Sequence, residues 1–343
     1  MSQSRSLSRR NLLGAAGALG LGALLSACGA DDGGSSGGSG SAPAGGPWNF
    51  TDDRGQSVRT DARPQRVVAF TGTAAALHDF GVADQLVGVF GPTTRPDGSP
   101  DVQAGDLDVG KVTVIGNTWG EFNIEKYAGL RPDLLVTHQY EEGALWYVPD
   151  ESKDKIAPLA PSVVLVASRA PLDKVIGRHA ELAAALGADL NAPRVTDAKA
   201  RFEAAAASIR QAVAEKPGLK VLACSAAADL FYASNPGVNS DILYYKSLGV
   251  DVIVPDKLDN LGYFESLSWE NADKYPADLL LLDNRSSTLQ PKDLTNKPTW
   301  GQLPAVRANQ VVGWNSEPRF SYAGSAAALE TLANAIRSAK KVA

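Results

Sequence analysis

Short apolar runs rich in β-branched residues and leucine alternate with helical patterns from residue 48 onward. This alternation is typical of α/β folds with mainly parallel sheets, whose strands are covered on both faces and so carry no charge. One helical segment, residues 74–80, has Thr73 as its predicted N-cap and Gly81 as its predicted C-terminal glycine. The predicted strands are residues 66–70, 86–90, 134–137, 162–166, 220–224, 252–254, 279–283 and 310–313.

Two segments in opposite halves of the chain share one pattern. Residues 125–135 and 270–280 place a glutamate, an aspartate and two leucines at the same spacing. Each segment predicts a short helix, a turn and a buried strand that ends in a polar or aromatic loop. Two αβ units could resemble each other for packing reasons alone. The pattern nevertheless favours two lobes of similar construction.

Between the two halves, apolar residues recur at helical spacing over residues 172–186 and 195–213. The second stretch contains no glycine or proline and predicts a continuous helix of about five turns, about 28 Å long. Such a helix would brace the lobes and permit only slight closure. The predicted fold is therefore α/β, with an N-terminal lobe (48–170), an interlobe helical spine (171–216) and a C-terminal lobe (217–343).

The first 27 residues predict an export signal and not part of a fold. Arg9 and Arg10 form a twin-arginine pattern, and an apolar run of small residues follows at 14–25. The run ends in Leu-Ser-Ala-Cys, which resembles the bacterial lipobox and implies cleavage before Cys28 and lipid attachment to its sulfur. We expect the mature chain at the outer face of the cytoplasmic membrane; the alternative is an uncleaved anchor with an incidental cysteine.

Residues 28–47 predict a flexible tether, because they are mostly glycine, serine, aspartate, alanine and proline. Removing 27 of 343 residues leaves 343 − 27 = 316, enough for two cores, and the loss of three arginines takes the formal charge from −5 to −8. That charge does not suit nucleic acid. Cys224 lies in an apolar run and predicts a buried thiol, and with Cys28 lipidated it has no disulfide partner.

Several loose motifs occur in a characteristic order. They are a Pro-Gln-Arg-Val-Val-Ala run at 64–69 after a turn at 52–55, the helix end at 77–81, the unit at 124–135, and Trp-x-x-Leu-Pro-Ala-Val-x-Ala at 300–308. From Trp48 onward the chain resembles the helical-backbone solute-binding proteins of iron–siderophore ABC importers. Within that family it is most similar to actinomycete lipoproteins that bind ferrioxamines, a similarity to which residues 229–234 and 264–270 contribute.

The resemblance implies a ligand, a partner and no catalysis. The ligand would be a ferric hydroxamate siderophore, with iron held by the siderophore and no further cofactor, and the partner would be an ABC importer permease. In this family one acidic residue on each lobe docks on the permease, and by position these are Glu125 and Glu270. Each could instead be a solvated carboxylate favoured by the helix dipole. We expect a monomer.

Ligands of α/β proteins bind beyond the carboxyl ends of strands. A tris-hydroxamate complex presents methylene linkers and oxygen acceptors, so it needs aromatic walls and a few donors. Related hydroxamate binders place a tyrosine and an arginine in the first lobe; Tyr140 matches the tyrosine, whereas Trp119 and its neighbours replace the arginine. Arg285 and Arg319 in the second lobe could supply donors, although each could be a surface residue. Two arginines suit a neutral or +1 complex better than a −3 catecholate.

Not every aromatic residue near a strand end can line one cleft. Trp146 and Tyr147 could pack against their own lobe, and Tyr232 could belong to the core of the second lobe. The complete set of predicted ligand-binding residues is Trp119, Tyr140, Trp146, Tyr147, Tyr232, Phe264, Arg285, Trp314, Arg319, Phe320 and Tyr322.

The sequence gives less support to other functions. Direct metal capture needs three or four converging ligands, whereas of the three histidines, His78, His138 and His179, only His138 lies near a strand end. Haem or cobalamin binding in the same fold remains an alternative, with Tyr140 or His138 as a ligand to haem iron. No nucleophile elbow or phosphate-binding loop occurs where it could act, so a lipid-anchored hydrolase would need a scattered active site.

Overall fold

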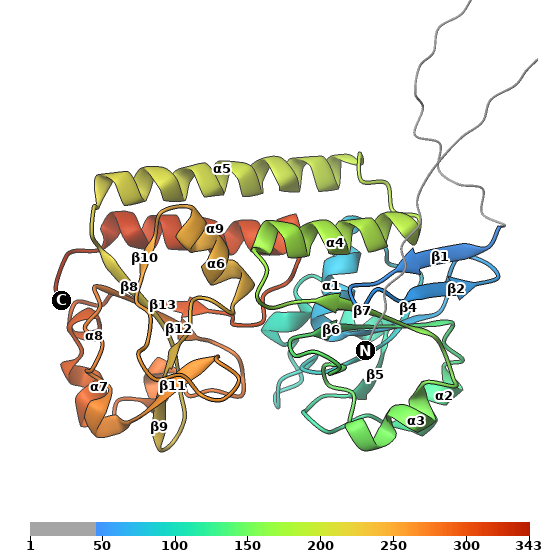
Figure 1. Cartoon of the computed structure of the whole chain (residues 1–343), viewed down its shortest axis with the longest axis horizontal. Coiled ribbons are helices and arrows are strands. Elements are labelled where there is room, and N and C mark those ends of the chain that lie inside the picture. The colour runs from blue at the N-terminus through green and yellow to red at the C-terminus, as the bar shows by residue number, and fades with distance from the viewer. Residues whose placement is uncertain (1–45) are drawn as a thin grey trace, which may run out of the picture. The chain divides into compact units, whose positions relative to one another are not determined.

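A computed structural model describes residues 46–343 of the chain. The predicted export signal, Cys28 and the tether up to residue 45 lie outside the described residues. Two sheets, one in each lobe, dominate the described part (Figure 1). The α/β class predicted from the alternation of apolar runs is confirmed.

The N-terminal lobe carries a parallel five-stranded sheet in the order β5-β4-β3-β6-β7. These strands are β3 (Val67–Phe70), β4 (Leu86–Phe90), β5 (Thr113–Gly116), β6 (Leu134–Gln139) and β7 (Ser162–Val166). A short antiparallel hairpin precedes them, β1 (Trp48–Thr51) and β2 (Ser57–Thr60). The side chains of β3 are completely buried, as expected for the centre of a sheet covered on both faces.

The C-terminal lobe carries a six-stranded mixed sheet in the order β11-β9-β8-β12-β13, with β10 beside β8. The strands are β8 (Lys220–Ala226), β9 (Leu230–Ser234), β10 (Asp251–Val252), β11 (Phe264–Ser268), β12 (Leu279–Asp283) and β13 (Val311–Trp314). All eight predicted strands are present, with ends shifted by at most two residues. The prediction missed β1, β2, β5, β9 and β11, because exposed or polar residues interrupt these short strands.

Helix α1 (Thr71–Phe80) begins directly at the end of β3. The predicted N-cap is wrong, because Phe70 occupies that position and Thr73 is buried inside the helix. Gly81 ends the helix in the left-handed conformation at φ 108°, as predicted. The smaller helices are α2 (Ile124–Gly129), α3 (Lys153–Ile156), α6 (Ser240–Ser247), α7 (Pro298–Gln302) and α8 (Pro304–Arg307). The 3₁₀ turns are η1 (Val102–Ala104), η2 (Val109–Lys111), η3 (Asp150–Ser152), η4 (Trp269–Asn271) and η5 (Pro291–Asp293).

Two long helices form the spine between the lobes. Helix α5 (Pro193–Glu215) has 23 residues, about 34 Å at 1.5 Å per residue, and extends the predicted helix by two residues at each end. It runs over both lobes and packs along α9 (Tyr322–Ser338), which the sequence analysis did not predict (Figure 1). The predicted stretch 172–186 forms α4 (Leu172–Ala185), which packs on α1, β1 and β7 of the N-terminal lobe and on α6.

The two spine helices are parallel and start at the N-terminal lobe. Arg194 at the start of α5 donates to the carbonyl of His78, and the Tyr322 ring at the start of α9 lies 5.9 Å from that of Phe80. Further along, Arg201 pairs with Glu330 through two 2.6 Å hydrogen bonds. Both helices therefore link the N-terminal lobe to the C-terminal lobe.

The aspartate of the repeated sequence pattern makes the same pair of hydrogen bonds in both lobes, although the predicted helix before it is α2 in the first segment and only the 3₁₀ turn η4 in the second. Asp133, before β6, accepts from the amide of Arg66 at 2.9 Å and returns a main-chain bond to its carbonyl at 3.1 Å. Asp278, before β12, makes the same pair with Lys220 at 2.8 and 2.9 Å. Each aspartate thus fixes the start of the neighbouring strand, which explains the shared spacing.

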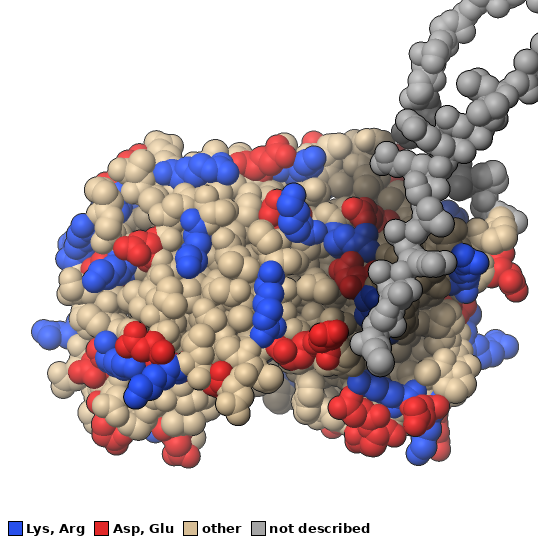
Figure 2. Space-filling view, viewed as in Figure 1, with Lys and Arg blue, Asp and Glu red and all other residues tan. Residues whose placement is uncertain are grey.

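Acidic and basic side chains are interspersed on the face shown in Figure 2, and a notch separates the two lobes at its lower edge. Within residues 46–343, no helix combines the length and apolar character required to cross a membrane. Cys224 is completely buried, as predicted, and this burial raises the pKa of its thiol.

Candidate functional site

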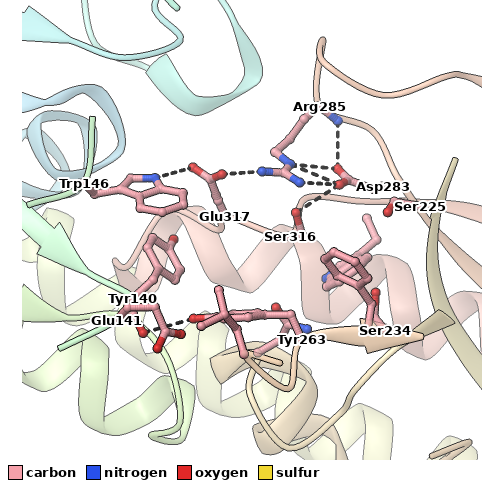
Figure 3. A pocket seen from close by; sticks show the side chains of 14 residues that line it. Tyr140, Glu141, Trp146, Ser225, Ser234, Tyr263, Asp283, Arg285, Ser316 and Glu317 are labelled. Atoms are coloured by element: carbon pink, nitrogen blue, oxygen red, sulfur yellow. Dashed lines mark hydrogen bonds and ion pairs between the residues drawn. The ribbon is translucent and has the colours of Figure 1, made fainter. Parts of the chain in front are cut away.

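A cavity of about 280 Å³ lies between the lobes. Its walls come from the loop after β6 and from the loops at the ends of β8, β9, β11, β12 and β13, so it lies where strand ends of the two sheets face each other (Figure 3). The lining residues are Tyr140, Glu141, Trp146, Ser225, Ser234, Asn239, Leu261, Tyr263, Phe264, Asp283, Arg285, Trp314, Ser316 and Glu317.

Aromatic rings form much of the wall. The rings of Tyr140 and Trp146 lie 4.5 Å apart on the N-terminal side, and Phe264 and Trp314 face them from the other lobe. Indole and phenol rings bury large apolar areas at low entropic cost. This arrangement suits a ligand whose outer surface is largely methylene.

Tyr140 carries a hydrogen-bonding group without a partner. The residue is only 8% exposed, and its hydroxyl contacts no donor or acceptor within the described residues. Burial, and then the negative charge of Glu317, raise the pKa of this hydroxyl well above its ordinary value, so it stays neutral. Leaving a buried hydroxyl unsatisfied costs free energy, and a ligand oxygen in the cavity would satisfy it.

Arg285 stands between two carboxylates (Figure 3). Its Nη2 donates to Asp283 Oδ2 at 2.7 Å and its Nη1 to Glu317. Asp283 is completely buried and Glu317 is 6% exposed. Burial alone would lower the pKa of the guanidinium, but the two carboxylates more than offset it and the pKa is raised. This network carries one positive and two negative charges. The terminal nitrogens of the Arg285 guanidinium already donate to these two carboxylates.

Glu317 also joins the two lobes. Its Oε2 accepts from Gln103 Nε2 at 2.8 Å and from Trp146 Nε1 at 3.2 Å, both in the N-terminal lobe. The carboxylate thus receives donors from opposite sides of the cavity (Figure 3). A charge-assisted link of this kind fixes the Trp146 ring at the wall.

Three predicted ligand residues, which lie between β13 and the first residue of α9, do not line this cavity. Arg319 pairs with Asp79 of α1 and with Asp106, each at 3.1 Å. Phe320 is completely buried, so its ring has no surface to offer a ligand. Tyr322 starts α9 and packs on Phe80. All three side chains contact the N-terminal lobe, through Asp79 and Phe80 of α1 and through His138, so none of them lines this cavity; Arg319 instead borders a second cavity of about 330 Å³.

Three other predicted aromatics lie beside the cavity without lining it. Trp119 is 65% exposed and its ring lies 4.9 Å from that of Trp146. With Tyr147 it lines a neighbouring cavity of about 240 Å³. Tyr232 supports Phe264 from behind, at 4.8 Å between ring centres. The predicted residues that do line the central cavity are Tyr140, Trp146, Phe264, Arg285 and Trp314.

The acidic members of the site escaped the sequence analysis. Glu141 follows Tyr140, Asp283 ends a leucine strand, and Glu317 lies in the loop that carries Arg319, so a strand-end position marked all three. All three side chains are hydrogen-bond acceptors, whereas a ligand rich in oxygen acceptors directs attention to donors. Tyr263 and Leu261 belong to the loop before β11, a strand that was not predicted, and no sequence signal marked them.

Two histidines that the sequence analysis treated separately are in contact. His138 Nε2 and His179 Nε2 lie 3.1 Å apart, and both side chains are buried. His179 Nδ1 lies 2.8 Å from the carbonyl of Val175, so it carries the proton and its Nε2 accepts from His138. Burial lowers the pKa of His179 to about 4, and burial together with His179 lowers the pKa of His138 well below its ordinary value.

His138 does not line the central cavity, which leaves it no access to a haem there. Within residues 46–343, no group of three or more histidine, cysteine, aspartate or glutamate side chains could hold a metal ion. The predicted docking residues Glu125 and Glu270 are exposed, on α2 and η4 respectively.

A sequence model of the periplasmic binding protein family matches residues 67–318. The solved structure of DesE, a ferric-siderophore receptor protein from Streptomyces coelicolor, is 53% identical, covers 86% of this chain and 100% of its own, and has a TM-score of 0.83. No curated protein sequence matches the chain.

Two more distant structures share the fold. A petrobactin-binding protein from Bacillus subtilis is 18% identical, covers 84% of this chain and 98% of its own, and has a TM-score of 0.64. An iron-uptake ABC transporter substrate-binding protein from Streptococcus pneumoniae is 21% identical, covers 87% of this chain and 99% of its own, and has a TM-score of 0.59.

Proposed function

Because this chain belongs to the periplasmic binding protein family, we propose that it captures a ferric hydroxamate siderophore in the cavity between its lobes and delivers it to an ABC importer. The family resemblance inferred from the sequence motifs is confirmed, and members of the family are binding proteins that work outside the cytoplasm. The similarity to a ferric-siderophore receptor at 53% identity supports a ferric siderophore as the ligand. Anchoring through Cys28 and export by the twin-arginine route stay part of the proposal.

The charge of the cavity wall is the observation that supports a hydroxamate siderophore as the ligand. Arg285 is neutralised by Asp283 and Glu317, and Arg319 lies elsewhere, so the network at the wall is negative. A −3 catecholate complex would meet these carboxylates; at 4 Å and an effective dielectric constant of 20 each like-charge contact costs about 4 kcal/mol. A neutral or +1 complex avoids that cost. It would use the aromatic walls and accept from the Tyr140 hydroxyl.

Titration of tryptophan fluorescence tests this proposal. We expect ferrioxamine or ferrichrome to bind with a Kd below about 10 µM, or about −7 kcal/mol, and a ferric catecholate to bind at least about 100-fold more weakly. Tyr140→Phe should weaken hydroxamate binding by about 3- to 10-fold, the loss of one hydrogen bond. Tyr322→Phe, which alters a tyrosine of the spine, should leave the affinity unchanged.

Tighter binding of the catecholate, or no binding of either hydroxamate, would contradict the proposed class. A Soret band on titration with haem would instead favour the haem alternative.

We also propose that Glu125 and Glu270 dock on the permease. Both are exposed and occupy equivalent positions in the repeated unit of the two lobes. Reversing both charges, Glu125→Lys with Glu270→Lys, should reduce siderophore-dependent iron uptake by cells at least about 10-fold, while the Kd of the purified protein stays within about twofold. The matched control reverses two exposed glutamates of the spine, Glu203→Lys with Glu215→Lys, and keeps uptake. Unchanged uptake in the first variant would rule out docking through these residues.

A further inference from the structure

One guanidinium outside the cavity contacts four of the residues that line it. Arg169 Nη1 donates to the main-chain oxygen of Tyr140 at 3.1 Å and to Glu141 Oε1 at 2.9 Å. The same nitrogen lies 3.3 Å from the Tyr263 hydroxyl, and Nη2 donates to the main-chain oxygen of Leu261 at 2.7 Å. Arg169 itself is not part of the lining. Its two terminal nitrogens therefore hold loops of opposite lobes.

The Tyr140 carbonyl is the centre of this arrangement. It accepts from Ser168 Oγ at 2.6 Å, from Arg169, and from the Tyr263 hydroxyl at 3.0 Å. The Tyr263 ring also lies under the guanidinium, 5.1 Å from its carbon to the ring centre. The backbone of Tyr140 is thus fixed by donors from three residues while its hydroxyl, on the cavity side, has no partner among the described residues.

The backbone of Arg169 is held as firmly as its side chain. Its φ is 57°, a left-handed conformation that residues other than glycine seldom adopt. Its amide donates to the carbonyl of Val238 at 2.9 Å, and the preceding Ser168 forms an isolated bridge with Asn239. The C-terminal lobe therefore fixes the segment through which the chain leaves the N-terminal lobe for α4.

We infer that Arg169 is a positioning residue, whose planar fork sets the relative placement of the Tyr140 loop and the Leu261–Tyr263 loop and thereby the shape of the ligand site. The inference rests on the proposed function, because it assigns the cavity to the siderophore. The Arg169 side chain is 43% exposed and that of Glu141 34%. An ion pair this exposed adds little to stability, so the main effect falls on ligand binding.

The geometry of the fork also distinguishes arginine from lysine. Lysine keeps the positive charge but offers one ammonium, which cannot reach the carbonyls of Tyr140 and Leu261 in the same planar arrangement. Arg169→Lys should therefore behave like Arg169→Gln. If charge alone mattered, lysine would restore binding.

The experiment compares Arg169→Gln and Arg169→Lys with Arg178→Gln in the full mature chain. Arg178 is a matched control, because it bonds to Asp53 at 2.7 Å and to the carbonyl of Thr51 at 2.8 Å and lies 5.1 Å from a phenylalanine ring, all away from the cavity. The probe is ferrioxamine, or the ferric siderophore that the unmodified protein binds most tightly. Kd and the dissociation rate are measured by tryptophan fluorescence, Tm by calorimetry, and local opening by amide hydrogen exchange.

Both Arg169 variants should bind at least about 10-fold more weakly, mainly through faster dissociation, with Tm within about 2 °C of the unmodified protein. Amides 140–142 and 261–263 should exchange at least about 10-fold faster. Arg178→Gln should leave Kd and these exchange rates within twofold. Affinity within twofold for Arg169→Gln, full rescue by lysine, or an equal loss in Arg178→Gln would overturn the inference.

Hydrogen exchange separates this inference from the proposed function. If the unmodified protein binds no ferric siderophore, the proposed function fails, and faster exchange of both loops in the Arg169 variants still supports their positioning by Arg169. Unchanged exchange in both loops would overturn the positioning role whatever the ligand.

Discussion

Arg285→Met lowers the free energy of unfolding by about 3–5 kcal/mol at pH 7, the largest effect expected of any single substitution in the site. The change leaves two buried carboxylates, Asp283 and Glu317, without the cation between them. Urea denaturation followed by circular dichroism measures the loss. The matched control is Arg201→Met, which removes a two-pronged pair with Glu330 on the exposed surface of the spine and should cost less than about 1 kcal/mol.

The cause of the loss can be tested by removing the two carboxylate charges as well. Without Arg285, the loss arises from the two buried carboxylates that have lost their cation, so neutral amides at both positions should reduce it. Adding Asp283→Asn and Glu317→Gln should recover most of the stability at pH 7. A deficit that neither change reduces would show that the buried charges are not its cause.

Acid destabilises the unmodified protein through the His138–His179 pair. The pKa of His179 is about 4 in the fold, against an ordinary value near 6.5. Between these pH values the unfolded chain binds the proton and the folded chain does not, so stability is fully present above pH 6.5 and falls as pH is lowered toward 4. The shift corresponds to about 3 kcal/mol from His179 alone, and the depressed pKa of His138 adds to it.

Urea midpoints measured from pH 8 to pH 4 test this expectation. In the double variant His138→Gln with His179→Gln, the fall in the urea midpoint that the two histidines cause between pH 6.5 and 4 should disappear. The variant should be less stable than the unmodified protein at pH 8. A slope identical to that of the unmodified protein would assign the acid sensitivity to other groups.

The main architecture could be predicted because its signals are local. Buried strands such as β4 and β12 are uninterrupted apolar runs, and Gly81 ends α1 because its conformation suits glycine. Strands β9 and β11 are not uninterrupted runs of this kind, since exposed or half-buried residues alternate with buried ones. Their pairing depends on tertiary contacts that the sequence pattern does not display.

Only those site residues that directly follow a recognisable strand could be predicted from the sequence. Tyr140 and Arg285 lie on the cavity because each follows an interior strand of its sheet, β6 and β12 respectively. Arg319 also follows a strand. Glu317, two residues earlier in the same loop, lines the cavity, whereas the Arg319 side chain pairs with Asp79 on α1. The direction in which a loop side chain points depends on the surface against which the next helix packs. Arg169, which is far along the sequence from any predicted ligand residue although it contacts Tyr140, illustrates the same limit.

The paired spine has a consequence for transport. Since α5 and α9 run side by side from one lobe to the other, bending the lobes together means bending two packed helices at once. The outer surfaces of the free and the loaded protein then differ little. An importer that recognises both lobes would meet competing copies that carry no cargo. Import would accordingly follow the fraction of the receptor pool that is loaded, and overproducing the receptor at a fixed siderophore supply would slow import.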